Sequence, residues 1–117
     1  MSAPPKFSLS RRNTYAERNS RLRCLGFRSY QKYLVSPLWR GIKKLVRAAK
    51  GDECFCGRPA TEYHHSRYLL CDLDGSCTDF IWPICSAHHR EIEFDERGNK
   101  RTAAEAGERF EELKSRA

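Results

Sequence analysis

The chain has 117 residues, enough for one small domain with a modest core. No apolar run approaches the roughly 20 residues that a membrane-spanning helix needs, so we expect no membrane partner. Residues 1–51 carry 13 basic residues and one acid (+12), whereas residues 52–117 carry 9 and 14 (−5), for a net charge of +7. This asymmetry favours contact between the front half and nucleic-acid phosphates; the alternative is a solvated basic helix and tail.

The N-terminal part of the chain predicts a basic arm followed by a basic helical region. Residues 1–20 are polar, contain a Pro-Pro pair and few apolar anchors, and are expected to form a flexible basic arm. They contain no apolar segment typical of a secretory signal, so we expect a cytoplasmic protein of a bacterial or phage-infected cell. An Arg- and Ser-rich start that is poor in acids is also typical of an organellar transit peptide. The basic helical region covers residues 21–51, and residues 21–35 predict a short helix at the edge of the domain.

The strongest helix signal is the segment SPLWRGIKKLVRAAKGD. Ser36 fits the N-cap, Pro37 fits the first turn, and Gly51 fits the end of the helix. Apolar residues recur at helical spacing and predict a buried stripe, in which Trp39 is a core anchor. The stripe comprises Leu38, Trp39, Ile42, Leu45, Val46 and Ala49. Cations cover much of the remaining surface and are candidate phosphate ligands. They include Arg40, Lys43, Lys44 and Arg47.

Residues 52–95 are rich in Cys, His, Gly and aromatic residues and are expected to form the core of the domain. Extended segments are predicted at 60–70 and 78–84.

The C-terminal segment, residues 96–117, predicts a turn followed by a helix. ERGNK favours a turn at 96–100. Thr102 and the Glu three residues later form a capping-box pattern that opens a helix over 103–115. Phe110 and Leu113 give this helix only a thin apolar face, which predicts packing at the periphery.

Two short Cys/His pairs, CFCG and CSAHH, are spaced about 30 residues apart, as in small zinc sites. The predicted ligands are Cys54, Cys56, Cys85 and His88. Gly57 suits the tight turn of the first pair, although its one-residue gap is shorter than the common two. Cys71 and Cys77 are spare thiols that could replace one of these ligands. Buried free cysteines without a metal are the other alternative.

All four histidines occur in adjacent pairs, His64-His65 and His88-His89. Neighbouring residues on a strand point to opposite faces, so His64 and His65 could serve separate purposes. Glu93 lies four residues after His89, on the same face of a helix predicted to start near His89. His64, His89 and Glu93 could therefore hold one divalent cation, while His65 takes a proton from water.

In this order and spacing, the residues resemble the HNH endonuclease family, whose active site is a ββα-metal motif. The resemblance covers about residues 30–93. YHHSRY is similar to the family's His-His strand, and IWPICSAHHREI is similar to its closing L-x-P-L-C-x-x-C-H segment. The resemblance implies a small α+β fold: a ββα-metal, treble-clef-like core over 52–95, stapled by structural zinc and flanked by the arm and helices. It also implies a metal-dependent hydrolase that cleaves DNA, of a type found in phages and mobile elements, restriction and repair.

The resemblance implies a role for each residue at the site. His64 and His89 match the ligands of the catalytic cation, and His65 matches the general base that activates water. Glu93 falls where many members have His or Asn, and a carboxylate there suits Mg²⁺ or Mn²⁺. The four zinc ligands match the family's structural site, with His88 in place of a cysteine.

Other positions depart from the family or stay open. The family's Asn falls near Phe80, where Asp79 could take over its role as a catalytic residue that orients the base. Arg67 and Arg90 are candidate phosphate clamps, although each could be an ordinary surface arginine.

Three functions are compatible with these observations. The first is a DNA endonuclease with Zn²⁺ in the staple and Mg²⁺ or Mn²⁺ at the active site. The second is a catalytically inactive zinc module that binds nucleic acid or a partner, which Phe80 at the Asn position favours. The third is a small zinc-stapled domain whose histidines are purely structural. The sequence does not determine the sequence specificity, the preference for DNA or RNA, or the oligomeric state.

Overall fold

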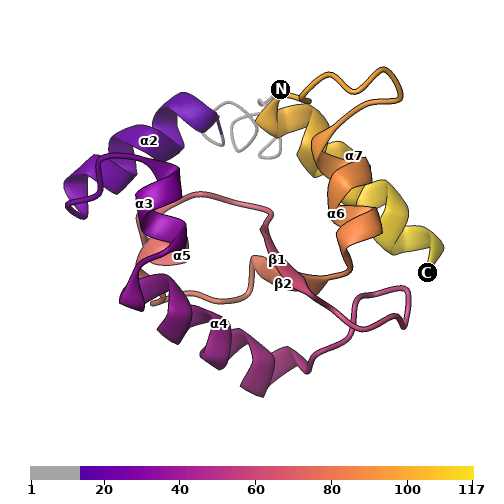
Figure 1. Ribbon diagram of the computed structural model, residues 1–117, viewed down its shortest axis with the longest axis horizontal. Coiled ribbons are helices and arrows are strands. Elements are labelled where there is room, and N and C mark those ends of the chain that lie inside the picture. The colour runs from indigo at the N-terminus through magenta and orange to yellow at the C-terminus, as the bar shows by residue number, and fades with distance from the viewer. Residues whose placement is uncertain (1–13) are drawn as a thin grey trace, which may run out of the picture.

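A computed structural model describes residues 14–117, which form an α+β fold of six helices and one two-stranded antiparallel sheet (Figure 1). In chain order the elements are α2 (Tyr15–Cys24), α3 (Tyr30–Leu34), α4 (Pro37–Lys50), β1 (Glu62–His65), α5 (Leu70–Asp74), β2 (Ile81–Ile84), α6 (Ser86–Glu93) and α7 (Ala103–Arg116). Within the described residues, no helix combines the length and the apolar content needed to cross a bilayer.

The short sheet lies between α4 on one side and the α6–α7 pair on the other (Figure 1). In its antiparallel register, His64 is opposite Trp82 and His65 is opposite Ile81. Because side chains alternate along a strand, the two histidines enter different halves of the molecule. The ring of His64 lies 4.8 Å from Phe110 of α7, whereas the ring of His65 lies 4.7 Å from Trp39 of α4.

The first of two apolar cores joins α2, α3, α4, α5, β2 and the first residue of α7. Its buried members are Leu22, Tyr33, Trp39, Ile42, Val46, Tyr68, Leu73, Ile81 and Ala103. Trp39 is a core anchor, as predicted, but the apolar stripe of α4 is narrower than its sequence pattern. Leu38 and Leu45 are 36% and 55% exposed, because the sheet and α3 cover only the face that carries Trp39, Ile42 and Val46.

The second core joins the turn of residues 54–57, β2, α6 and α7. Its buried members are Cys54, Ile84, Cys85, Ile92, Ala106, Phe110 and Leu113. The prediction that the C-terminal helix is peripheral is therefore wrong. Ala103 and Ala106 extend its buried face by a turn, and the capping box of Thr102 and Glu105 begins the helix as predicted. The buried face is wider than Phe110 and Leu113 alone indicate, because small alanines allow close helix packing.

The N-terminal region differs from its prediction in two ways. A helix, α2, begins at Tyr15, inside the segment expected to be a flexible arm, and Thr14 caps it. The remainder of that arm, residues 1–13, lies outside the described residues. The single short helix expected over 21–35 is divided into α2 and α3, because Gly26 adopts a φ of 94°, which ends the first helix.

The strands are shorter than the extended segments predicted for them. Only 62–65 and 81–84 pair, and the unpredicted helix α5 begins at Leu70, the last residue of the first segment. The turn at 96–100 is confirmed: Asp95 and Asn99 form a backbone hydrogen bond of 2.9 Å, and Gly98 takes a φ of 82°.

Candidate functional site

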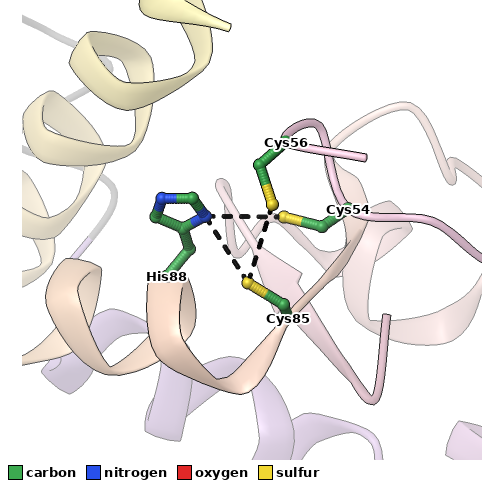
Figure 2. A group of neighbouring side chains, drawn as sticks. All are labelled: Cys54, Cys56, Cys85 and His88. Atoms are coloured by element: carbon green, nitrogen blue, oxygen red, sulfur yellow. Dashed lines mark hydrogen bonds between the residues drawn. The ribbon is translucent and has the colours of Figure 1, made fainter. Parts of the chain in front are cut away.

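Four predicted ligands, Cys54, Cys56, Cys85 and His88, converge in the structure (Figure 2). The first two lie on a tight turn in which the Gly57 N–H donates to the carbonyl of Cys54 at 2.9 Å. Gly57 has a φ of 89°, a conformation that other residues rarely adopt, and this confirms its predicted place in the turn. Cys85 is the N-cap of α6 and His88 lies in its first turn. α6 therefore starts at Ser86, earlier than the predicted start near His89.

Three of the six distances between these donor atoms are close to the edges of a tetrahedral zinc site, and all four atoms lie within 4.8 Å of one another. His88 Nδ1 lies 3.5 Å from Cys85 Sγ and 3.8 Å from Cys54 Sγ, and Cys56 Sγ lies 3.9 Å from Cys85 Sγ. Zinc–sulfur bonds of about 2.3 Å and zinc–nitrogen bonds of about 2.0–2.1 Å give tetrahedral edges of about 3.5–3.8 Å. The cluster could therefore hold a structural zinc ion.

The surroundings of the cluster support the same conclusion. The Phe55 ring stacks on His88 at 5.0 Å and also contacts Phe110 of α7, so the second core fixes the imidazole. Burial raises the pKa of Cys54, whereas the backbone N–H of Arg58 lowers the pKa of Cys56. The spare thiols Cys71 and Cys77 are not part of the cluster.

A second group of potential ligands comes from β1 and one face of α6: His64, His89 and Glu93. Glu93 Oε2 lies 3.6 Å from His64 Nδ1 and 3.9 Å from His89 Nε2. Two further residues contact the atoms of this group that do not face the other ligands. Glu62 Oε1 lies 2.6 Å from His89 Nδ1, and Lys100 binds Glu93 Oε1.

The protonation states of this group suit metal binding. Burial lowers the pKa of His64 to about 3, and the neighbouring His89 acts in the same direction. Burial alone would raise the pKa of Glu93, but the hydrogen bond and charge of Lys100 bring it below its ordinary value. At neutral pH the group therefore offers a carboxylate and a neutral imidazole, both of which are metal donors.

His65 lies in an aromatic cage on the opposite side of β1. It is 3% exposed, stacks on Trp39 at an interplanar angle of 26°, and contacts the rings of Tyr33 and Tyr68. Its Nδ1 lies 3.2 Å from the Tyr30 hydroxyl, whereas its Nε2 is buried without a hydrogen-bond partner among residues 14–117. Burial lowers the pKa of His65 to about 3, so the ring is neutral at pH 7.

A pocket of about 850 Å³ borders both sides of β1 and includes His64, His65, His89 and Glu93. Its remaining walls are rich in cations. These are Arg18, Arg23, Arg28, Lys43, Arg47 and Lys100. The structure thus combines the predicted histidines and carboxylate with a strongly basic surface.

Several candidates from the sequence lie outside this pocket. Arg40 and Lys44 are exposed on α4, and Arg90 borders a different pocket. The Arg67 guanidinium is 2.7 Å from the Asp72 carboxylate and lies 3.7 Å above the Phe80 ring. Its charge is therefore already paired.

Asp79, the predicted substitute for the family's Asn, is exposed and does not border the pocket. Its backbone carbonyl, and not its carboxylate, accepts a hydrogen bond from Lys50 Nζ at 2.8 Å.

Other residues of the pocket were not predicted from the sequence. Three arginines of its wall come from α2 and the segment after it, and Tyr30 comes from α3. The place of Glu62 beside the site could have been predicted from the sequence, because it lies two residues before His64 and therefore on the same face of β1. No sequence pattern predicts the contact between Lys100 and Glu93, since it forms only through the turn that follows α6.

No family model, no curated protein and no solved structure matches the chain.

Proposed function

We propose that the protein is a metal-dependent endonuclease of the HNH type, which hydrolyses phosphodiester bonds in DNA. The observation that carries this proposal is the basic pocket, where His64, His65, His89 and Glu93 meet five cations in addition to Lys100, which is paired with Glu93. Cations bind the charged oxygens of a phosphodiester, and a neutral imidazole can accept a proton from water.

The order of the elements supports a ββα-metal core. β1, β2 and α6 follow one another, with His64 and His65 on the first strand and His89 on the helix. The Cys54–Cys56 turn precedes β1, and the Cys85–His88 pair opens α6, as a treble-clef zinc site would require. This arrangement supports the family resemblance on grounds other than the spacing of residues along the chain.

The donor set of His64, His89 and Glu93 fits a divalent cation such as Mg²⁺ or Mn²⁺. All three donor atoms lie within 4.8 Å of one another, and Glu62 and Lys100 orient two of the ligands from outside. When bound, the cation would stabilise the charge that develops on the phosphate and on the leaving 3′ oxygen.

His65 would move the proton. Its imidazole is neutral and borders the pocket, and the buried Nε2 would accept a proton from a water molecule that enters from there. The water oxygen then bonds to phosphorus, the bond from phosphorus to the 3′ oxygen breaks, and solvent protonates that oxygen. The cations of the pocket wall would hold the substrate by its phosphates and not by its bases.

Replacing Glu93 by Gln tests the cation site. Removal of outer-shell partners costs about 10–100-fold in metal affinity or activity, so the loss of a ligand should cost at least about 100-fold in both. We expect calorimetric titration of this variant with Mn²⁺ to show no binding at the site, and we expect its rate of plasmid nicking to fall by a similar factor.

Glu96→Gln is the matched control, because Glu96 is exposed on the following turn and does not border the basic pocket. It should bind Mn²⁺ and nick DNA like the unmodified chain. Equal Mn²⁺ binding by the two variants would contradict the proposed cation site.

Replacing Lys43 and Arg47 by Ala tests the basic wall. Removing one phosphate-binding cation should reduce the slope of log affinity against log salt by about 1, so the double variant should reduce it by about 2. The measurement is a fluorescence titration of a DNA duplex at several salt concentrations.

Arg97→Ala is the control for that titration, because it removes one positive charge from an exposed position outside the pocket. If Arg97→Ala changes the slope as much as each wall substitution does, binding is a property of net charge and not of the pocket.

A second candidate is a catalytically inactive zinc module that binds nucleic acid. The burial of His65 in its aromatic cage favours it, because a histidine packed in this way also serves as a core residue. Asp79 outside the pocket favours it as well. This module would bind DNA in a salt-sensitive manner without nicking it, and it would bind zinc alone.

A further inference from the structure

The aromatic cage raises the question of which group orients His65. The family's Asn is expected near Phe80, whose ring lies under the Arg67 guanidinium, and the neighbouring Asp79 does not border the pocket. The hydroxyl that reaches His65 comes instead from α3: Tyr30 Oη lies 3.2 Å from His65 Nδ1, between residues 35 apart in the chain.

The environment of the imidazole indicates which nitrogen carries the proton. If the Tyr30 hydroxyl donated to Nδ1, the proton of His65 would be on Nε2, a buried atom with no acceptor among the described residues. If Nδ1–H donates to the tyrosine oxygen, only a lone pair at Nε2 is left without a partner. Buried N–H groups without an acceptor are rarer than incompletely paired acceptors, so the second arrangement is favoured.

We propose that Tyr30 is the positioning residue of His65: its hydroxyl oxygen accepts from Nδ1–H and leaves the Nε2 lone pair available to accept a proton. The role in proton transfer rests on the proposed nuclease function, whereas the tautomer itself does not. The proposal makes α3 part of the site, although α3 lies outside the ββα core.

The neighbours of Tyr30 hold its hydroxyl in place. Its ring stacks on Tyr33 at an interplanar angle of 16°, and the guanidinium of Arg18, which also borders the pocket, lies 3.9 Å from its centroid. Burial raises the pKa of Tyr30, so the hydroxyl stays protonated and neutral beside the imidazole. Tyr30 also borders the pocket, which lets its own O–H turn toward bound water or phosphate.

The test is a long-range ¹H–¹⁵N spectrum of the zinc-loaded full chain with labelled histidine, in which His65→Gln assigns the His65 signals. We expect a protonated Nδ1 and an unprotonated Nε2. Tyr30→Phe should convert this single tautomer to a mixture, because the ring stays but the acceptor is lost. Tyr68→Phe is the matched control: its ring also contacts His65, at 5.6 Å, and its substitution should leave the tautomer unchanged.

Nicking assays on the same variants separate the two proposals. Tyr30→Phe should lower kcat by about tenfold or more while KM stays constant, the scale of one lost orienting hydrogen bond. A protonated Nε2 in the unmodified chain overturns the proposal, and this readout does not require any variant to fold. An unchanged tautomer and kcat in Tyr30→Phe overturn it as well. If the unmodified chain does not nick DNA, the nuclease function fails, and the spectra still decide the role of Tyr30.

Discussion

Replacing His65 by Gln is expected to reduce DNA nicking by about 10²–10⁴-fold, the contribution of a positioned general base, while the protein stays folded and zinc-loaded. Gln is close to the imidazole in volume and can keep a hydrogen bond to Tyr30, but it cannot take up a proton at neutral pH. It is preferable to Ala, because His65 packs directly on Trp39 and truncation would leave a cavity in the first core.

The assay is the relaxation of supercoiled plasmid in Mg²⁺, in Mn²⁺ and in EDTA. Gln31→Ala is the control, since Gln31 borders the same pocket and is exposed, with no acid–base capacity. Undiminished nicking by a folded His65→Gln protein would reject the assignment of the base. Absence of nicking by the unmodified, zinc-loaded protein would favour the inactive binding module.

Zinc removal is expected to unfold the second core outright. Structural zinc contributes about 10–16 kcal/mol in small zinc modules, which equals or exceeds the roughly 5–15 kcal/mol stability of a typical domain. Cys85→Ser removes one ligand and should have the same effect, because Cys85 joins β2 to α6. The measurements are zinc content and thermal unfolding by circular dichroism, with and without a strong chelator.

Cys77→Ser is the matched control for this substitution, since Cys77 is half-buried and lies outside the metal cluster. It should retain one zinc ion and melt like the unmodified protein. A chelated chain that melts at the same temperature as the untreated chain would show that the four residues are free thiols and a histidine packed without metal.

The sequence predicts best where local chemistry determines the structure. The ends of α4 predicted from Ser36, Pro37 and Gly51 agree with the observed helix to within one residue, because capping and backbone restrictions act over one turn. The Cys/His spacing predicts a convergent cluster for the same reason: ligands on two tight turns can meet at one ion. The alternation of side chains along β1 also predicts that His64 and His65 diverge.

The remaining features depend on contacts between distant parts of the chain. Leu45 has the periodicity of a core residue but is exposed, because no described element covers that face of α4. α7 is buried through alanines, which have too weak a hydrophobic signal to distinguish a core helix from a peripheral one. Tyr30 and Lys100 reach the pocket only after α3 and the 95–99 turn have packed, so their sequence neighbours give no indication of a role.

The adjacency of His88 and His89 on α6 implies that the two proposed metal sites would be thermodynamically linked. One turn of helix supplies a ligand to the Cys₃His cluster and, at the next residue, a ligand to the pocket. An ion in the first site would fix the start of α6 and with it His89, so the second site would bind its cation without the entropic cost of ordering that ligand. On this proposal the Cys₃His cluster would bind its zinc ion first, and the pocket group would bind its cation only in the zinc-loaded protein.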